Sequence, residues 1–201
     1  SRDWSYYINL SGQDYPIKPR EVIRDTLKAA WPRNFVEVET FAEKRAYQPD
    51  DPHLKRRLTF DLFGIRRLVT PIPLPAPKLI DMDFKGSHWH MLSREFCDWM
   101  VDAPIRRHVE RYLRFTSCPS EVFIQTMIMN SPFAEDRMGH SGREVIWPGP
   151  KVLDSGDYDR LMRSPALFAR KFDQTKDPDI LLRLAKSNGY IVPSPVEAIP
   201  S

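Results

Sequence analysis

The chain has 201 residues, of which 41% are hydrophobic and 11% aromatic, which is enough for one buried core in a single α/β domain. Its formal net charge of +3 is too small to indicate a nucleic-acid-binding surface. No stretch approaches the roughly 20 apolar residues of a membrane span, and two cysteines, Cys97 and Cys118, cannot form a disulfide framework.

The first part of the chain alternates predicted strands and helices. Residues 6–10 are rich in β-forming side chains and end at a turn, which predicts a buried strand. A helix is predicted over residues 19–31, opened by a proline. Residues 34–39 alternate as a strand does, whereas residues 40–70 are charged and ambiguous. Residues 70–78 hold four prolines and predict an extended loop.

The second part again alternates the two kinds of element. Residues 87–92 are predicted to form a strand, and Ser93 to cap the helix that follows it. The other helices are predicted over residues 104–115, 118–133, 156–173 and 177–188. A further strand is predicted at Arg143–Trp147. Strands therefore alternate with helices, and the predicted fold class is α/β.

Glu121 places a carboxylate near the N-terminal end of the predicted buried helix 118–133, whose other residues are mostly apolar. Acidic residues are favoured in a first helical turn by the partial positive charge of its amides, which explains Glu121 without any chemistry. The other interpretation is a general base, because a carboxylate held ionised at a helix N-terminus and aimed outward can accept a proton. Glu121 taken alone leaves both interpretations open.

Two histidines at alternate positions, His88 and His90, suggest a metal site. Alternate residues of a strand share a face, so both could ligate a metal together with Asp81 or Asp83. No wider ligand pattern accompanies them. We therefore favour a strand with two polar side chains around a buried Trp89, and no metal.

Basic side chains occur in several clusters. Arg170 and Lys171 lie between the aromatic residues of Phe168–Asp173, and they either form a solvated turn over the core or clamp a diphosphate. The other basic runs are interpreted as charged surface rather than as a docking site for a membrane or a sulfated glycan. They are residues 55–57, Arg66–Arg67 and Arg106–Arg107.

Five segments together resemble one family, glycosyltransferase family 14, which comprises the core-2/I-branching β-1,6-N-acetylglucosaminyltransferases and the peptide O-xylosyltransferases. In the family's order they are WSYYINLSGQDYPIKP, KGSHWHMLSREFCDWMV, CPSEVFIQTMIMNSPF, REVIW and SPALFARKFD. The resemblance implies a GT-A type fold, a mixed sheet flanked by helices, present as its C-terminal two-thirds. Residues 1–201 would then be a single glycosyltransferase domain whose first part lies upstream, which also suits a chain that opens directly on a strand.

The resemblance also implies an activity and the residues that carry it. The Glu of the third segment is the catalytic base of an inverting transfer in the resembling enzymes, and Glu121 matches it. Lys171 matches the family's diphosphate-binding Lys, and Arg170 and Arg143 are expected to assist it. Basic side chains rather than a metal would neutralise the leaving UDP, as in the core-2 branch, so no metal is expected.

The acceptor side of the resemblance is mixed. Glu37 aligns with an acceptor-binding Glu of the core-2 branch, whereas His88, with Trp89 beside it, lies where the xylosyltransferases carry an acceptor-side Asp. We expect transfer of xylose or N-acetylglucosamine from a UDP-sugar to a hydroxyl of a glycan, a peptide or a small molecule. The alternatives are a non-catalytic carbohydrate- or anion-binding fragment and a metal-dependent hydrolase using His88 and His90.

The cysteine content bears on localisation. Two cysteines in 201 residues favour a bacterial-type cytoplasmic enzyme over one of the secretory pathway. Peripheral contact with a membrane is an alternative, and so is the Golgi if the source is eukaryotic, because eukaryotic members of the resembling family are membrane-associated.

Overall fold

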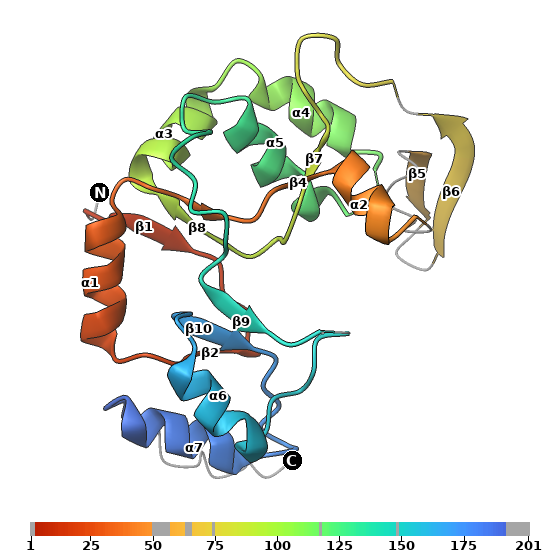
Figure 1. Ribbon diagram of the computed structural model, residues 1–201. Helices are drawn as coiled ribbons and strands as arrows, with labels where there is room; N and C mark the ends of the chain where they lie inside the picture. The colour runs from red at the N-terminus through yellow and green to blue at the C-terminus, as the bar shows by residue number, and fades with distance from the viewer. Residues whose placement is uncertain are drawn as a thin grey trace, which may run out of the picture. The chain divides into compact units, whose positions relative to one another are not determined.

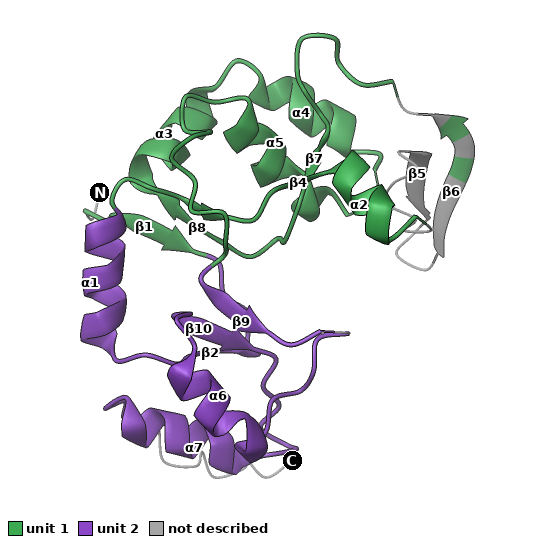
Figure 2. Ribbon diagram, in the orientation of Figure 1, with its two compact units in different colours: residues 1–8, 31–141 green, residues 9–30, 142–201 purple. Residues whose placement is uncertain are grey.

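The computed structural model describes residues 3–49, 57–62, 66–73, 75–116, 118–147 and 149–191. Helices and short strands are mixed along them, so the predicted α/β class is confirmed (Figure 1). The chain divides into two compact units, which Figure 2 shows in different colours. Unit 1 comprises residues 1–8 and 31–141, and unit 2 comprises residues 9–30 and 142–201. The prediction of a single domain over residues 1–201 stays a prediction.

A three-stranded antiparallel sheet lies in unit 1, with strand order β1–β8–β3. The central strand β8 (His90–Ser93) is buried at all four positions. Its neighbours are β1 (Tyr6–Ile8) and β3 (Phe35–Val36). The prediction that residues 6–10 form a buried strand is wrong in part, because β1 pairs on one side only and leaves Tyr7 50% exposed.

Three helices enclose the main core of unit 1. They are α3 (Arg94–Asp102), α4 (Arg106–Leu113) and α5 (Phe123–Met129). The predicted cap of α3 is confirmed, since the Ser93 hydroxyl accepts a hydrogen bond of 3.3 Å from the Phe96 amide. The largest fully buried side chains of this core include Phe96, Leu92, Met127 and Ile128.

The predicted strand over residues 34–39 is two short strands. After β3, the chain forms β4 (Glu39–Thr40), which pairs with β7 (Phe84–Lys85) rather than with β8. The helix α2 (Phe41–Tyr47) follows directly and lies in the region left ambiguous by its charge. Its capping box, formed by Thr40 and Glu43, was a local signal that could have revealed it.

Strands β5 (Arg57–Leu62) and β6 (Arg66–Pro73) form an antiparallel hairpin. The predicted loop 70–78 is therefore wrong for its first four residues, which belong to β6. Proline is compatible with this strand because its fixed φ suits an extended backbone. Each strand of a two-stranded hairpin also has an outer edge, where a missing N–H removes no hydrogen bond between the strands. Residues 55–56 of the first basic run lie outside the described residues.

Unit 2 contains a mixed sheet with strand order β2–β10–β9. The central strand β10 (Phe168–Arg170) runs antiparallel to β2 (Asp14–Pro16) and parallel to β9 (Arg143–Val145). The predicted helix 156–173 is therefore wrong at its C-terminal end. Only α6 (Tyr158–Arg163) is α-helical there, because the chain turns extended at Ser164, before a proline.

The two remaining helices of unit 2 agree with their predictions. They are α1 (Arg20–Ala30), which has no buried residue, and α7 (Pro178–Ser187), which the Asp177 carboxylate caps. The apolar core of this unit consists of Ile17, Leu153, Leu161, Ala169, Phe172, Ile180 and Leu184. No helix within the described residues is long and apolar enough to cross a membrane.

We predict that two leucines of α7 respond differently to the same substitution. Leu184 is fully buried, whereas Leu182 is 46% exposed. Leu184→Ala should lower the free energy of unfolding by about 2–5 kcal/mol, because it removes apolar contacts and leaves a cavity. Leu182→Ala should change it by no more than about 0.5 kcal/mol. Urea unfolding measures both, and equal losses would contradict the packing of α7 described here.

Candidate active site

Glu121 ends a short 3₁₀ helix, Pro119–Glu121, that precedes α5. The predicted continuous helix 118–133 is wrong at its start, because Cys118 adopts a left-handed conformation (φ 51°) and α5 begins only at Phe123. Glu121 therefore lies before the first turn of α5. Glu121 is an acidic residue in the first turn of the 3₁₀ helix, as the helix-end interpretation requires, and the structure adds a specific partner.

That partner is Lys85, the last residue of β7. Its Nζ lies 3.6 Å from Oε2 of Glu121, and the lysine side chain is only 5% exposed while the glutamate side chain is 34% exposed. The other carboxylate oxygen, Oε1, makes no hydrogen bond with any residue that the structure describes. One oxygen of Glu121 thus faces a buried cation and the other is available to a ligand.

The backbone joins the same two segments. The Gly86 amide donates a hydrogen bond of 2.9 Å to the Glu121 carbonyl. A Cβ atom on Gly86 would lie 2.0 Å from the Glu37 carbonyl oxygen, so only glycine permits this approach. Gln125, which is fully buried in α5, donates 2.6 Å to the Ser87 carbonyl and 3.4 Å to that of Glu37. Residues 85–87, Glu37 and the start of α5 therefore form one cluster within unit 1.

The predicted acceptor-side residues lie in or beside this cluster. The Glu37 carboxylate accepts hydrogen bonds from Ser141, 2.7 Å from its hydroxyl and 3.2 Å from its amide. The His88 ring packs against Trp89 with centroids 4.0 Å apart. Trp89 is 8% exposed, so most of its ring is packed inside the protein. Glu37 therefore has a defined orientation, and His88 is the more accessible member of its pair.

The metal alternative finds no geometric support. His88 precedes β8 rather than lying in it, so it does not share a strand face with His90. His90 is buried and packs against Tyr7, with ring centroids 5.9 Å apart. Across the described part of the chain, no group of three or more His, Cys, Asp or Glu side chains could hold a metal ion.

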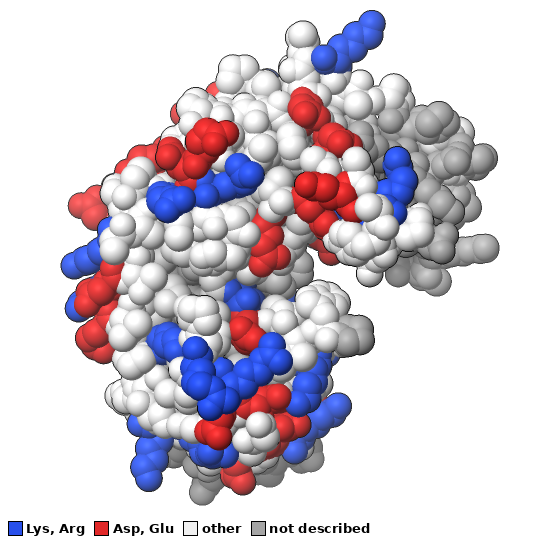
Figure 3. Space-filling view, in the orientation of Figure 1, with Lys and Arg blue, Asp and Glu red and all other residues white. Residues whose placement is uncertain are grey.

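Lys171 and Arg170, the predicted diphosphate-binding residues, lie at the end of β10 in unit 2. The Lys171 carbonyl accepts a hydrogen bond of 2.8 Å from the Leu153 amide, which fixes the backbone. The Lys171 side chain is half-buried and makes no hydrogen bond or ion pair with the described residues. Phe168 and Phe172 on either side are buried. Lys and Arg atoms cover more of the visible face of unit 2 than Asp and Glu atoms do (Figure 3).

Arg143 differs from the other predicted cations because its side chain is completely buried. Its Nε lies 2.6 Å from the Asp14 carboxylate, which is also buried, and its Nη2 donates 2.7 Å to the Asn9 carbonyl. The Ser11 amide donates a further hydrogen bond of 2.7 Å to Asp14. The pair joins β9 to the first residue of β2. Arg143 is thus engaged inside unit 2, and its geometry favours a structural role over contact with a nucleotide.

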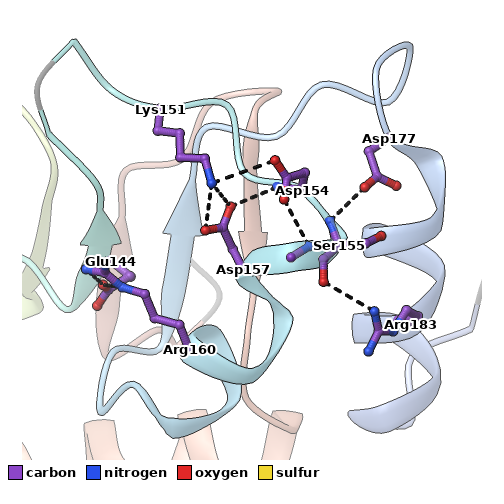
Figure 4. A network of polar contacts seen from close by, with 9 residues as sticks. Glu144, Lys151, Asp154, Ser155, Asp157, Arg160, Asp177 and Arg183 are labelled. Carbon is purple, nitrogen blue, oxygen red and sulfur yellow. Dashed lines mark hydrogen bonds and ion pairs between the residues drawn. The ribbon is translucent and has the colours of Figure 1, made fainter.

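Lys151, a further basic residue of unit 2, belongs to a surface network (Figure 4). Its Nζ donates to both oxygens of Asp157, at 2.7 and 2.8 Å, and lies 3.7 Å from Asp154. Hydrogen bonding to Asp157 raises the pKa of Lys151. This lysine is therefore neutralised by two carboxylates, unlike Lys171.

The comparison with known protein families identifies the chain. The Core-2/I-Branching enzyme family model matches residues 1–167. The chain belongs to this family. The resemblance seen in its five sequence segments is thereby confirmed.

Named relatives agree with the family. Xylosyltransferase 2 of Canis lupus familiaris is 26% identical over 209 residues, covering 89% of this chain and 22% of that protein. Xylosyltransferase of Ciona intestinalis is 26% identical over 213 residues, covering 91% and 23%. Beta-glucuronosyltransferase GlcAT14B of Arabidopsis thaliana is 29% identical over 216 residues, covering 95% and 46%. The chain spans less than a quarter of the length of these xylosyltransferases.

Sequence reasoning missed Lys85. The residue stands in the segment KGSHWHML that supports the family assignment, yet nothing near it in sequence marks it as buried. Lysine is almost never fully buried without a partner, and its partner lies 36 positions further along the chain, at Glu121. Only the pairing of β7 with β4 and its contact with the segment before α5 reveal the ion pair.

We predict that the buried ion pair of Arg143 contributes much more to the free energy of unfolding than the surface ion pair of Arg160. Arg143→Met should cost about 3–5 kcal/mol of unfolding free energy, because Asp14 would stay buried without its partner. Arg160, whose side chain is 55% exposed, lies 2.8 Å from Glu144. Arg160→Met should cost only about 0.2–1 kcal/mol. Urea unfolding and calorimetric titration with UDP test this, and an Arg143→Met protein of normal stability that no longer binds UDP would restore the nucleotide-binding role.

Proposed function

We propose that this chain carries the catalytic base and diphosphate-binding residues of an inverting glycosyltransferase of GT-A type that uses a UDP-sugar. The observation that carries the proposal is the environment of Glu121. Its carboxylate is partly exposed, with Oε2 toward a buried lysine and Oε1 without a hydrogen-bond partner among the described residues. It also occupies the position of the family's catalytic Glu in the segment CPSEVFIQTMIMNSPF. A general base needs such a carboxylate, ionised and able to reach a ligand.

The reaction is a single displacement at the anomeric carbon of the donor. The acceptor hydroxyl oxygen forms the new bond to that carbon while its proton passes to Oε1 of Glu121. The bond between the anomeric carbon and the diphosphate oxygen breaks, and its electron pair leaves with UDP. Attack from the face opposite UDP inverts the anomeric configuration. The role of Glu121 is proton acceptance alone, with no covalent intermediate.

On the donor side, Lys171 is the principal diphosphate ligand in this proposal. Its ammonium group makes no hydrogen bond or ion pair with the described residues, although its charge interacts with the Asp173 carboxylate. A cation stabilises the negative charge that develops on the leaving UDP. Arg170 at the end of β10 supports it. We expect the transfer to proceed without a metal, because these side chains supply the positive charge that a metal otherwise provides.

The proposal extends to the residues that bind the acceptor and to the sugar that is transferred. Glu37, whose carboxylate is oriented by Ser141, and His88, packed on Trp89, are the proposed acceptor-binding residues. The names of the relatives favour a xylosyl or a glucuronosyl donor. The alignment of Glu37 with an acceptor-binding Glu of the core-2 branch favours N-acetylglucosamine. The acceptor is a hydroxyl of a glycan, a peptide or a small molecule. We propose a bacterial-type cytoplasmic location because the chain contains few cysteines.

The test of the proposal is Glu121→Gln in the full-length protein. Gln keeps the shape of the side chain but cannot accept a proton, so transfer should fall by about 100- to 10,000-fold while UDP affinity stays within about threefold. Glu110→Gln on α4 is a matched control, since Glu110 is 51% exposed and pairs with Arg106 on its own helix. Activity of Glu121→Gln within a few-fold of the wild type would overturn the proposal.

Lys171→Ala tests the donor side. Loss of a charge-assisted hydrogen bond to phosphate should weaken UDP binding by about tenfold or more, with little change in stability. Lys176→Ala serves as the control, because Lys176 is exposed on the turn that follows. Calorimetric titration with UDP beside thermal melts separates the two effects. Normal UDP binding together with a much lower melting temperature would show that Lys171 is structural.

A further inference from the structure

We propose that Lys85 is a positioning residue for sugar transfer. Its buried ammonium group holds Oε2 of Glu121, and this orients Oε1 toward the acceptor hydroxyl. The inference rests on the proposed role of Glu121 as the base, and it adds a residue that the sequence did not single out. Lys85 neither gives nor takes a proton in the reaction, so the proton balance is that of the transfer itself.

The burial of Lys85 is the first argument. Its side chain is 5% exposed, and burial of an ammonium group is unfavourable unless a counter-charge and hydrogen bonds compensate for lost hydration. Glu121 supplies such a charge at 3.6 Å. If surface solubility were the only requirement at this position, an exposed lysine would satisfy it. A buried cation beside a partly exposed carboxylate instead favours one orientation of that carboxylate.

The rigidity of the connection is the second argument. Lys85 and Glu121 are fixed to one another by the Gly86 amide, which donates to the Glu121 carbonyl at 2.9 Å. Gln125 repeats the connection one turn later by donating to the Ser87 carbonyl at 2.6 Å. A Cβ on Gly86 would collide with Glu37, so the whole segment is held close by a contact that only glycine allows. The backbone that carries Lys85 is therefore fixed beside that of Glu121, and the lysine side chain is buried rather than free on the surface.

The consequence concerns orientation more than charge. A carboxylate that can rotate freely presents either oxygen in many directions, and misplacement by about 1 Å can cost about 100-fold in rate. The attraction between the Lys85 ammonium group and Oε2 reduces the number of orientations open to Oε1. Removing the cation should therefore lower turnover while leaving donor binding intact.

The experiment compares Lys85→Met and Lys85→Arg in the full-length enzyme, with UDP-xylose, UDP-N-acetylglucosamine and UDP-glucuronate as donor probes. Lys85→Met should lower kcat by about 10- to 100-fold with the donor KM within about threefold, and Lys85→Arg should recover most of the loss. Lys18→Met is the matched control, since Lys18 is half-buried and donates 2.9 Å to the Met162 carbonyl in unit 2. It should keep the wild-type kcat.

A double-mutant cycle decides how Lys85 acts. If Lys85 works only through Glu121, the double variant of Lys85→Met with Glu121→Gln should be no slower than Glu121→Gln alone. A further loss of about tenfold would show an independent role and overturn the inference. Full activity of Lys85→Met beside an inactive Glu121→Gln would overturn it too, while leaving the proposed function intact. An active Glu121→Gln would instead overturn the proposed function.

A crystal structure of a Lys85 variant provides a test that needs no turnover. Lys85→Gln replaces Lys85→Met here and in the cycle if the methionine variant does not fold. The Glu121 side chain should lose its single arrangement in the variant. An unchanged carboxylate position would show that Lys85 does not orient it.

Discussion

The ion pair between buried Lys85 and half-exposed Glu121 is the constraint on which the proposed site depends. A buried ammonium needs a carboxylate, and a carboxylate with one oxygen so engaged can present the other to a ligand. The short strand pairing of β7 with β4, the glycine at position 86 and the buried Gln125 all serve this geometry. The same ion pair therefore compensates the buried charge of Lys85 and orients the proposed base in this cluster of unit 1.

The basic residues of unit 2 differ from one another in their carboxylate partners. Arg143 and Asp14 are both fully buried and neutralise each other, whereas Lys151 is held by two carboxylates at the surface. Lys171 has no such partner among the described residues, although its backbone is fixed beside the buried Phe172. A cation that makes no ion pair with the described residues, at a rigid strand end, is suited to an anionic ligand. Position within unit 2, rather than residue type, distinguishes these three cations.

Local signals predicted the elements whose causes are local. The Ser93 cap of α3 and the helix α7 could be read directly, and so could the strand β9. The segment Phe168–Arg170 was predicted as helical, because its central position between β2 and β9 is set by residues far away in sequence.

Long-range contacts explain what the sequence alone could not predict in the site. Glu121 was identified through its motif, but its position in a 3₁₀ turn depends on the left-handed Cys118 and on contacts with β7. The burial of Lys85 has no local signature at all. Arg143 was predicted to bind the nucleotide, because the carboxylate that neutralises it lies more than a hundred residues earlier in the sequence, at Asp14.

The anomeric configuration of the product tests the central claim most directly. The claim is that Glu121 acts as a base in one displacement rather than as a nucleophile in two. Proton NMR of the fresh product of the full-length enzyme, made from an α-linked UDP-sugar, should show a β-linkage through its large anomeric coupling. An α-linked product would mean net retention, and it would contradict both the single displacement and the role given to Glu121.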